Sequence, residues 1–359
     1  MRKNITISLL LGGVLSVLAL YFAFKNVPFY SIYRYLRSID YIWIIPSIML
    51  GLLGFVLRVI RWQVLLLSVR PLGFWQSFHP LMVGFMVNCI LPGRVGEAVR
   101  PLILQKKEKI SFITGLATVA TERVFDITIL IVFFALLLLN LEINPDYSIR
   151  YGDYQLNRRM LEIISGGMLK LCFLLIVGIV LISVKQSRRL IVDFIMKLPG
   201  LFSWAGKTFK DKMAEKICLP ITRGIEHIAI GFQMVKKPRR MLFCLVLTIA
   251  VWLLTAASYY VMAFGCPGVN LSFLEFAAVM IIICFFIALP SVPGFWGVWE
   301  AGGVFALTLF GVSAADSAGF TLANHAAQII PVILVGFGSA VYTGIDIWRI
   351  SHELKTHAD

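Results

Sequence analysis

Residues 91–98 read LPGRVGEA, and residues 289–301 read LPSVPGFWGVWEA. Both follow the pattern Pro-Gly-x-x-Gly and then Glu-Ala, with two extra residues before the second glutamate. Each copy lies between hydrophobic segments, where a Pro-Gly break frees backbone groups that hydrocarbon cannot satisfy. Such a pair of interrupted segments, one in each half of a chain, points to the substrate site of a transporter. The residues that make the two predicted breaks are Pro92, Gly93, Gly96, Pro293, Gly294 and Gly297.

The composition indicates a polytopic helical membrane protein. The chain is 59% hydrophobic and only 14% charged, and several apolar runs are long enough to span a bilayer. In such a protein a net charge of +14 indicates cytoplasmic loops that face anionic lipid, so we expect no nucleic-acid partner. The six cysteines form no CxxC or Cys/His cluster, so we expect no disulfide framework or zinc site. The sequence also has no HExxH or Asp-rich metal motif, and we expect no metal or redox cofactor.

Hydropathy predicts an all-α fold with about eight membrane segments in one domain, residues 1–359. Two broken units, at 73–104 and 272–311, are long enough for helical hairpins or for two tilted spans each, and hydropathy does not choose between these. The first repeat covers about 41–139 and the second about 241–345. Six full spans are expected near residues 5–24, 41–67, 112–139, 162–183, 241–264 and 316–345.

The charge distribution predicts the sidedness. Residues 184–240 carry 13 Lys and Arg against four acids, a net of +9, whereas the loop at 140–161 has a net charge of zero. The positive-inside rule then places both termini and the 184–240 connection in the cytoplasm. This connection forms either amphipathic helices on anionic inner-leaflet lipids or an ordinary solvated loop. With this sidedness the two breaks approach the membrane centre from opposite faces, as inverted repeats suited to alternating access do.

The first break predicts an anion site. A half-helix that begins after residue 93 would offer free N–H groups and its positive dipole end. Arg94, Glu97 and Arg100 follow at spacings of three, and the planar guanidinium of Arg94 suits phosphate. In the alternative interpretation, the two arginines flank an ordinary membrane-exit point.

More charged residues lie in or near predicted spans. Glu122, Arg123 and Asp126 fall within 112–139, where charges usually face partners or a cavity. Arg58 and Arg61 lie near the inner end of the second span. Their default is to extend to the cytoplasmic headgroups, and the alternative is a role in substrate binding. We include Arg58 among the candidate substrate-binding residues.

The second break contributes Glu300. Its carboxylate could pair with an arginine of the first repeat, accept a proton or cap its own helix start. We expect Glu300 and Glu97 to occupy matching places and to line one central cavity. His325, in the last span, is interpreted as a helix-packing hydrogen-bonder, with a proton relay as the alternative.

Three motifs carry a family resemblance: NCILPGRVGEAVR at 88–100, ERVFD at 122–126 and PSVPGFWGVWEA at 290–301. They resemble the flippase-like transmembrane region of lysylphosphatidylglycerol synthases, in a stand-alone form without the soluble aminoacyl-transferring domain. The resemblance implies translocation of an anionic phospholipid or a polyprenyl-phosphate-linked lipid across a prokaryotic plasma membrane.

We therefore expect a lipid flippase and not an enzyme. The sequence contains no P-loop, so ATP is not the expected energy source. Two other functions remain open. The carboxylates at 97, 122, 126 and 300 could serve an enzyme that modifies a lipid or a lipid-linked sugar. The chain could also be a non-catalytic membrane partner of a separate synthase or glycosyltransferase.

Overall fold

The structure is a computed structural model. It describes residues 2–25, 27–92, 94–140, 149–151, 154–156, 184–201, 206–231, 237–289 and 291–346, together with short helical pieces between 166 and 181. Gly93, Pro290, most of the expected span at 162–183 and most of the loop at 140–161 lie outside the described residues.

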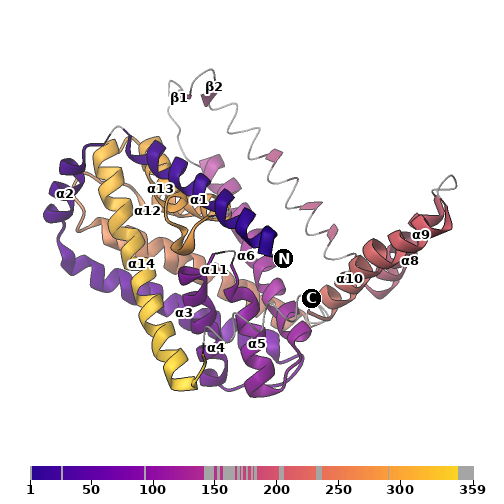
Figure 1. Cartoon of the computed structure of the whole chain (residues 1–359). Helices are drawn as coiled ribbons and strands as arrows, with labels where there is room; N and C mark the ends of the chain where they lie inside the picture. The colour runs from indigo at the N-terminus through magenta and orange to yellow at the C-terminus, as the bar shows by residue number, and fades with distance from the viewer. Residues whose placement is uncertain are drawn as a thin grey trace.

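The described residues are almost entirely helical, as expected for this class of membrane protein (Figure 1). One antiparallel hairpin, β1 (Ile149–Tyr151) with β2 (Tyr154–Leu156), is the exception to the all-α expectation. The helices are α1 (Arg2–Phe24), α2 (Phe29–Ser38), α3 (Ile44–Leu66), α4 (Phe74–Ile90), α5 (Gly96–Glu108), α6 (Phe112–Asn140), α8 (Lys185–Leu201), α9 (Lys207–Met213), α10 (Leu219–Gly231), α11 (Pro238–Ala263), α12 (Phe273–Ile287), α13 (Val298–Leu309) and α14 (Ala314–Thr343).

Within the described ranges, three helical segments are long and apolar enough to cross a membrane: Tyr41–Leu66, Pro238–Ala263 and Ala314–Thr343. A fourth is added if Gly12–Phe24 and Phe29–Ser38, which meet at a bend of 78°, count as one span. These helices support a multi-pass membrane protein. The described part of the chain accounts for three or four of the expected segments by length and composition.

The first broken unit is a tight pair of helices, α4 and α5. Arg94 takes up a left-handed backbone conformation (φ 55°) between them, and Pro92 and Gly96 lie at the same break. A Cβ atom added to Gly96 would collide with the Gly84 carbonyl oxygen of α4. A glycine is therefore needed at residue 96 so that the two helices can approach this closely.

The second broken unit consists of α12, a short 3-10 turn (Pro293–Phe295) and α13. Its turn bends sharply, because Gly294, Phe295 and Gly297 all have positive φ values, of 72°, 61° and 91°. Both predicted breaks are thus breaks between helices in the structure. The predicted break residues that are described (Pro92, Gly96, Pro293, Gly294 and Gly297) all lie between helices or at a helix start.

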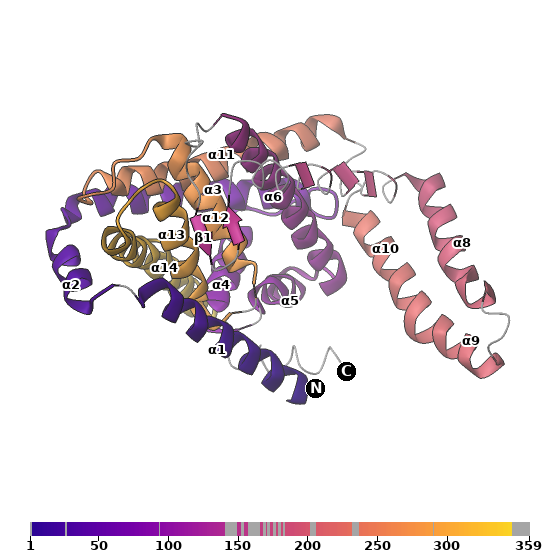
Figure 2. The ribbon, with the colours of Figure 1, turned by 90° about the horizontal axis from the view of Figure 1, so that it is seen from above.

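The bundle brings the two breaks together. The turn of the second unit packs against α4, and a Cβ atom added to Gly294 would lie 3.3 Å from the Cys89 carbonyl oxygen near the end of α4. Around them, α3 packs along α11, α14 along α4, and α1 against α13. Helices α8, α9 and α10 form an arm that extends away from the bundle and is attached through contacts of α10 with α6 (Figures 1 and 2).

Candidate functional site

A cavity of about 210 Å³ lies between the two broken units, where α3, α6, α11 and α14 also meet. Its walls come from two hydrophobic cores, because Trp299 and Ile283 belong to one core and Val332 to the other. Aromatic rings make much of the apolar wall. The charged residues that line it are Arg58, Arg94, Glu97, Arg123 and Asp126, all of which the sequence singled out.

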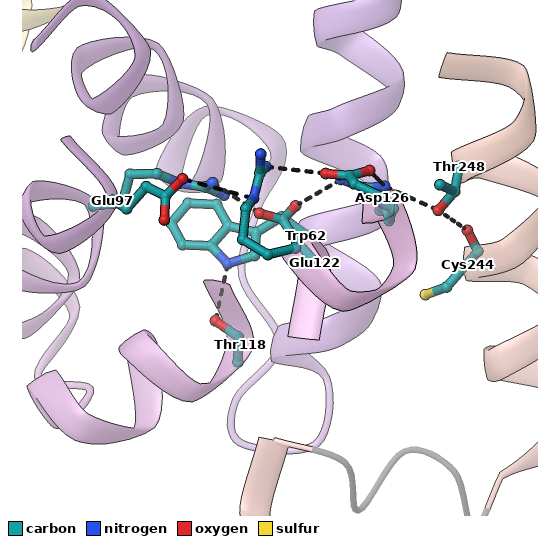
Figure 3. Close-up of polar contacts among 10 residues, drawn as sticks. Trp62, Glu97, Thr118, Glu122, Asp126, Cys244 and Thr248 are labelled. Carbon is teal, nitrogen blue, oxygen red and sulfur yellow. Dashed lines mark hydrogen bonds and ion pairs between the residues drawn. The ribbon is translucent and has the colours of Figure 1, made fainter. Parts of the chain in front are cut away.

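A buried ion network lies beside the cavity (Figure 3). Arg61 of α3 is fully buried, and its Nη1 donates to Asp126 Oδ1 at 2.6 Å and to Thr248 Oγ1 at 2.9 Å. A second bond, from Nη2 to Asp126 Oδ2 at 3.2 Å, makes the pair bidentate. The expectation that Arg61 extends to the headgroups is therefore wrong. Asp126 and Thr248 face this arginine from inside the bundle, so its charge is satisfied there.

Glu122 joins two buried arginines. Its carboxylate lies 2.7 Å from Nη1 of Arg100 on α5 and 3.6 Å from Nη2 of Arg61. The guanidinium of Arg100 also lies over the Trp62 ring, 4.1 Å from its centroid, and Trp62 donates to Thr118 at 3.0 Å. Arg100 and Glu122 are thus buried against each other and do not line the cavity. Their contacts hold α3, α5 and α6 together beneath it.

Arg123 and Glu97 face the cavity. Arg123 Nη2 is 3.1 Å from Asp126 Oδ2, and its Nε is 3.9 Å from Glu97 Oε1. Both side chains are partly open, at 31% and 30% exposure. The Arg123–Glu97 pair is longer and partly solvated, so breaking it costs less free energy than breaking the buried Arg61–Asp126 pair.

Arg58 forms neither a close ion pair nor a hydrogen bond with any of the described residues. Its guanidinium lies over three rings at the cavity wall, 5.0 Å from Phe55, 5.6 Å from Trp252 and 5.9 Å from Phe85. Aromatic rings stabilise a cation only partly, because they offer no hydrogen-bond acceptor to the N–H groups in the plane of the Arg58 guanidinium. Across the whole cluster, five arginines meet three carboxylates, so positive charge is in excess.

Arg94 bridges the two broken units. It is exposed, and its Nη2 donates to the Ile287 carbonyl oxygen at 2.8 Å. Ile287 is the last residue of α12, so the cation lies at the negative end of that helix dipole.

The start of α5 is not an open anion site. The Gly96 N–H donates to Asn88 Oδ1 at 2.7 Å, and the N–H groups of Glu97 and Ala98 donate to backbone carbonyls of the turn. The free N–H groups expected after the first break are therefore already bonded at these three residues. The acceptors are the Asn88 side chain of α4 and the carbonyl oxygens of Arg94 and Val95 in the turn.

Glu300 lies apart from the cavity. It is fully buried, and its Oε2 accepts a 2.7 Å hydrogen bond from the Gly297 N–H at the start of α13. Its Oε1 is 2.5 Å from Nδ1 of His325, which is also fully buried. Glu300 therefore caps its own helix, one of the three roles considered for it, and it does not line the cavity with Glu97.

Two parts of this arrangement were not anticipated from the sequence. Arg61 is the centre of the buried network, and His325 is the partner of Glu300. The spacing of Arg58 and Arg61 indicated that Arg61 shares a helix face with a candidate site residue, since residues three apart lie on the same face. No local sequence pattern indicates the pairing of Glu300 with His325, because these residues lie on different helices.

Comparison with known proteins adds the family. The lysylphosphatidylglycerol synthase TM region matches residues 9–336. A UPF0104 membrane protein of Methanothermobacter thermautotrophicus is 23% identical over 320 residues, which are 87% of this chain and 88% of the relative. The glycosyltransferase AglD of Haloferax volcanii is 27% identical over 132 residues, 35% of this chain and 21% of the relative. No solved structure matches this chain.

Proposed function

This chain belongs to the family of the lysylphosphatidylglycerol synthase TM region, and we propose that it is a flippase for an anionic membrane lipid. The observation that carries the proposal is Arg58, a cation with no close ion pair or hydrogen bond among the described residues, which faces a cavity between two broken helical units. The lipid would be an anionic phospholipid or a polyprenyl-phosphate-linked lipid, because both offer phosphate oxygens to such a cation.

The cavity suits a headgroup and not a whole lipid. At about 210 Å³ it accommodates a phosphate and its nearest substituents, while the acyl or prenyl chains would remain in the bilayer. The phosphate would bind Arg58 first. It would then compete with Glu97 for Arg123, whose pair is long at 3.9 Å and partly solvated. The dry Arg61–Asp126 pair would stay intact and hold the cavity floor.

Movement across the membrane would use the two breaks. We propose that they form inverted repeats and that relative movement of the units opens the cavity to each face in turn. Both termini and the 184–240 connection would lie in the cytoplasm of a prokaryotic plasma membrane. The arm of α8 to α10 would then rest on anionic inner-leaflet lipids, since it combines many basic residues with exposed apolar ones such as Leu190, Phe194 and Phe209.

A second function is favoured by one relative. The AglD match covers about a third of this chain, and AglD is named as a glycosyltransferase. On this basis the chain would be a membrane partner of a separate glycosyltransferase, or would itself act on a lipid-linked sugar. The carboxylates of the cluster would then serve as acid and base.

One reconstitution experiment separates these functions. Purified chain is placed in vesicles that contain fluorescent phosphatidylglycerol, phosphatidylcholine or a polyprenyl phosphate, and the label reaching the outer leaflet is measured with an impermeant quencher. We expect faster movement of the anionic lipids and no covalent change in any of them. A changed lipid mass would favour an enzyme, and no movement of any lipid would favour a partner protein.

Arg58→Gln provides the variant test. We expect it to slow the movement of the anionic lipid on the order of tenfold, the effect of losing one hydrogen bond to a charged group. The matched control is Arg37→Gln, which removes another arginine that lies over a ring (Tyr33, 4.7 Å) but does not line the cavity. Equal rates in the two variants would remove Arg58 from the site.

A further inference from the structure

The turn of the second break is held in a strained conformation. Phe295 has φ 61°, a value that a side chain with a Cβ atom rarely adopts, and the glycines on either side of it in the break also have positive φ. Such a turn persists only where its surroundings hold it. The same turn carries Phe295 into the cavity wall, and Trp299 of the next helix lines that wall as well.

Two side chains hold this turn, one at each end. Glu300 accepts from the Gly297 N–H, and Nε2 of His325 lies 2.9 Å from the Gly294 carbonyl oxygen. The imidazole is also enclosed by rings. It stacks on Trp299 at 4.5 Å with an interplanar angle of 3°, and the Trp296 ring lies 4.5 Å away on a tilt.

The donors and acceptors in this arrangement require a proton between the two side chains. A carbonyl oxygen only accepts, so Nε2 of His325 must carry hydrogen to bond to Gly294. The 2.5 Å contact between Nδ1 and Glu300 Oε1 then needs a second hydrogen, on either the ring or the carboxyl group. In both cases the pair holds one proton more than a neutral histidine beside a carboxylate.

Glu300 and His325 thus act as a clamp on the turn, and loss of that proton would break one of the contacts in this clamp. If Nε2 kept its hydrogen, the lone pair of Nδ1 would face a carboxylate oxygen at 2.5 Å. If the hydrogen moved to Nδ1, the Nε2 lone pair would face the Gly294 carbonyl oxygen instead. Either contact is repulsive: the first pushes Glu300 and His325 apart, and the second removes the hydrogen bond between His325 and the Gly294 carbonyl oxygen.

No other charged or titratable group among the described residues could take over the role of this proton. In the described part of the chain, none of the titratable or charged groups on the packed elements forms a hydrogen bond or an ion pair with Glu300 or His325. These groups include Tyr21 on α1, Lys25 just after α1, Tyr35 on α2, Arg58 on α3, Cys89 near the end of α4, Arg94 after it, Tyr259 on α11, Cys284 on α12 and Asp316 on α14.

We propose that Glu300 and His325 form a buried proton-binding site whose proton clamps the second break against α14. Release of the proton to water opens the turn and shifts Phe295 and Trp299 at the cavity wall. The site is a property of the break itself and goes beyond the proposed lipid transport. Its test therefore needs no lipid movement.

Glu300→Gln is the informative variant. Its amide oxygen can accept from Gly297 N–H, and its NH₂ group can donate to Nδ1 of a histidine that keeps hydrogen on Nε2. All three hydrogen bonds of the clamp survive, but no proton can leave. The matched control is Glu275→Gln, because Glu275 caps α12 in the same way, accepting from the Ser272 N–H at 2.7 Å, with no histidine beside it.

The measurement is amide hydrogen exchange of peptides covering 291–300 in the full chain in detergent. It is followed by mass spectrometry from about pH 5 to about pH 10 and corrected for the intrinsic rates. In the wild type and in Glu275→Gln, we expect corrected exchange to rise on the order of tenfold towards high pH, as for the loss of one buried hydrogen bond. In Glu300→Gln it should stay flat.

The tryptophan fluorescence of the unmodified chain, whose eight tryptophans include Trp296 and Trp299 beside His325, gives a second readout, should the glutamine variant not fold. A transition of this fluorescence within the same pH range, while circular dichroism stays constant, is expected. The proposal is overturned if the wild type shows no pH-dependent exchange or fluorescence in this range. It is also overturned if a folded Glu300→Gln variant shows the same rise as the wild type.

Discussion

Arg94 Nη2 lies 2.8 Å from the Ile287 carbonyl oxygen, although 193 positions separate the two residues. One residue belongs to the first break and the other to the helix that leads into the second. Their bond therefore ties together the two units whose relative movement the flippase proposal requires. A single exposed hydrogen bond is weak enough to break during such a movement.

Arg94→Ala should loosen this tie and weaken the binding of anionic lipid. We expect a loss of about 1 kcal/mol in stability, because the bond is exposed, and lower retention of phosphatidylglycerol during purification. Arg94→Lys should restore both only partly, since an ammonium lacks the planar fork. Copurified lipid is measured by mass spectrometry. Full retention of the lipid in the alanine variant would exclude a role for Arg94 in binding.

Arg61→Leu should be far more damaging than the loss of a surface arginine. It leaves Glu122 and Asp126 short of a cation inside the bundle, and removing one partner of a buried pair costs about 3 kcal/mol or more. The control is Arg188→Leu on the arm, whose 3.2 Å pair with Glu226 is partly exposed, with side chains 19% and 51% open, and should cost less than about 1 kcal/mol. Unfolding in mixed micelles compares the two. Similar losses would mean that the buried network adds no more stability than a surface pair.

Gly96→Ala should separate α4 from α5. A methyl group at residue 96 meets the Gly84 carbonyl oxygen, so backbone has to shift at a cost of about 1–3 kcal/mol. Gly338→Ala is the control, because nothing lies within 4 Å of a Cβ atom added there and alanine favours a helix by about 1 kcal/mol. The thermal midpoints of the two variants in detergent should move in opposite directions, and a midpoint for Gly96→Ala at or above that of the parent chain contradicts the close packing.

The sidedness of the membrane can be tested with two engineered thiols. Lys212→Cys on the arm should react with an impermeant maleimide only after the cells are opened, because the +9 charge of residues 184–240 favours the cytoplasm. Asn270→Cys, in the exposed turn after α11, should react in intact cells. The parent chain supplies the background labelling of its own cysteines. The reverse pattern would invert the proposed orientation.

The sequence determined the class of the protein, because a chain that is 59% hydrophobic with long apolar runs has few alternatives to membrane helices. It also located both breaks, since proline and glycine disrupt a helix through local backbone geometry. The charges that meet at the cavity could be identified for a similar reason. A charge within an apolar run is costly unless it finds a partner, so Arg123 and Asp126 were expected to face one.

Only the tertiary structure decided which charges meet. Arg61 binds Asp126 and not the headgroups, and Glu300 turns towards His325 and away from the cavity that Glu97 lines. The start of α5 is likewise bonded by Asn88 and by its own turn, although its sequence suggested free amides. These outcomes depend on how helices cross and rotate against one another. Side chains far apart in sequence become partners only once the helices have packed, and local sequence patterns do not encode how the helices pack.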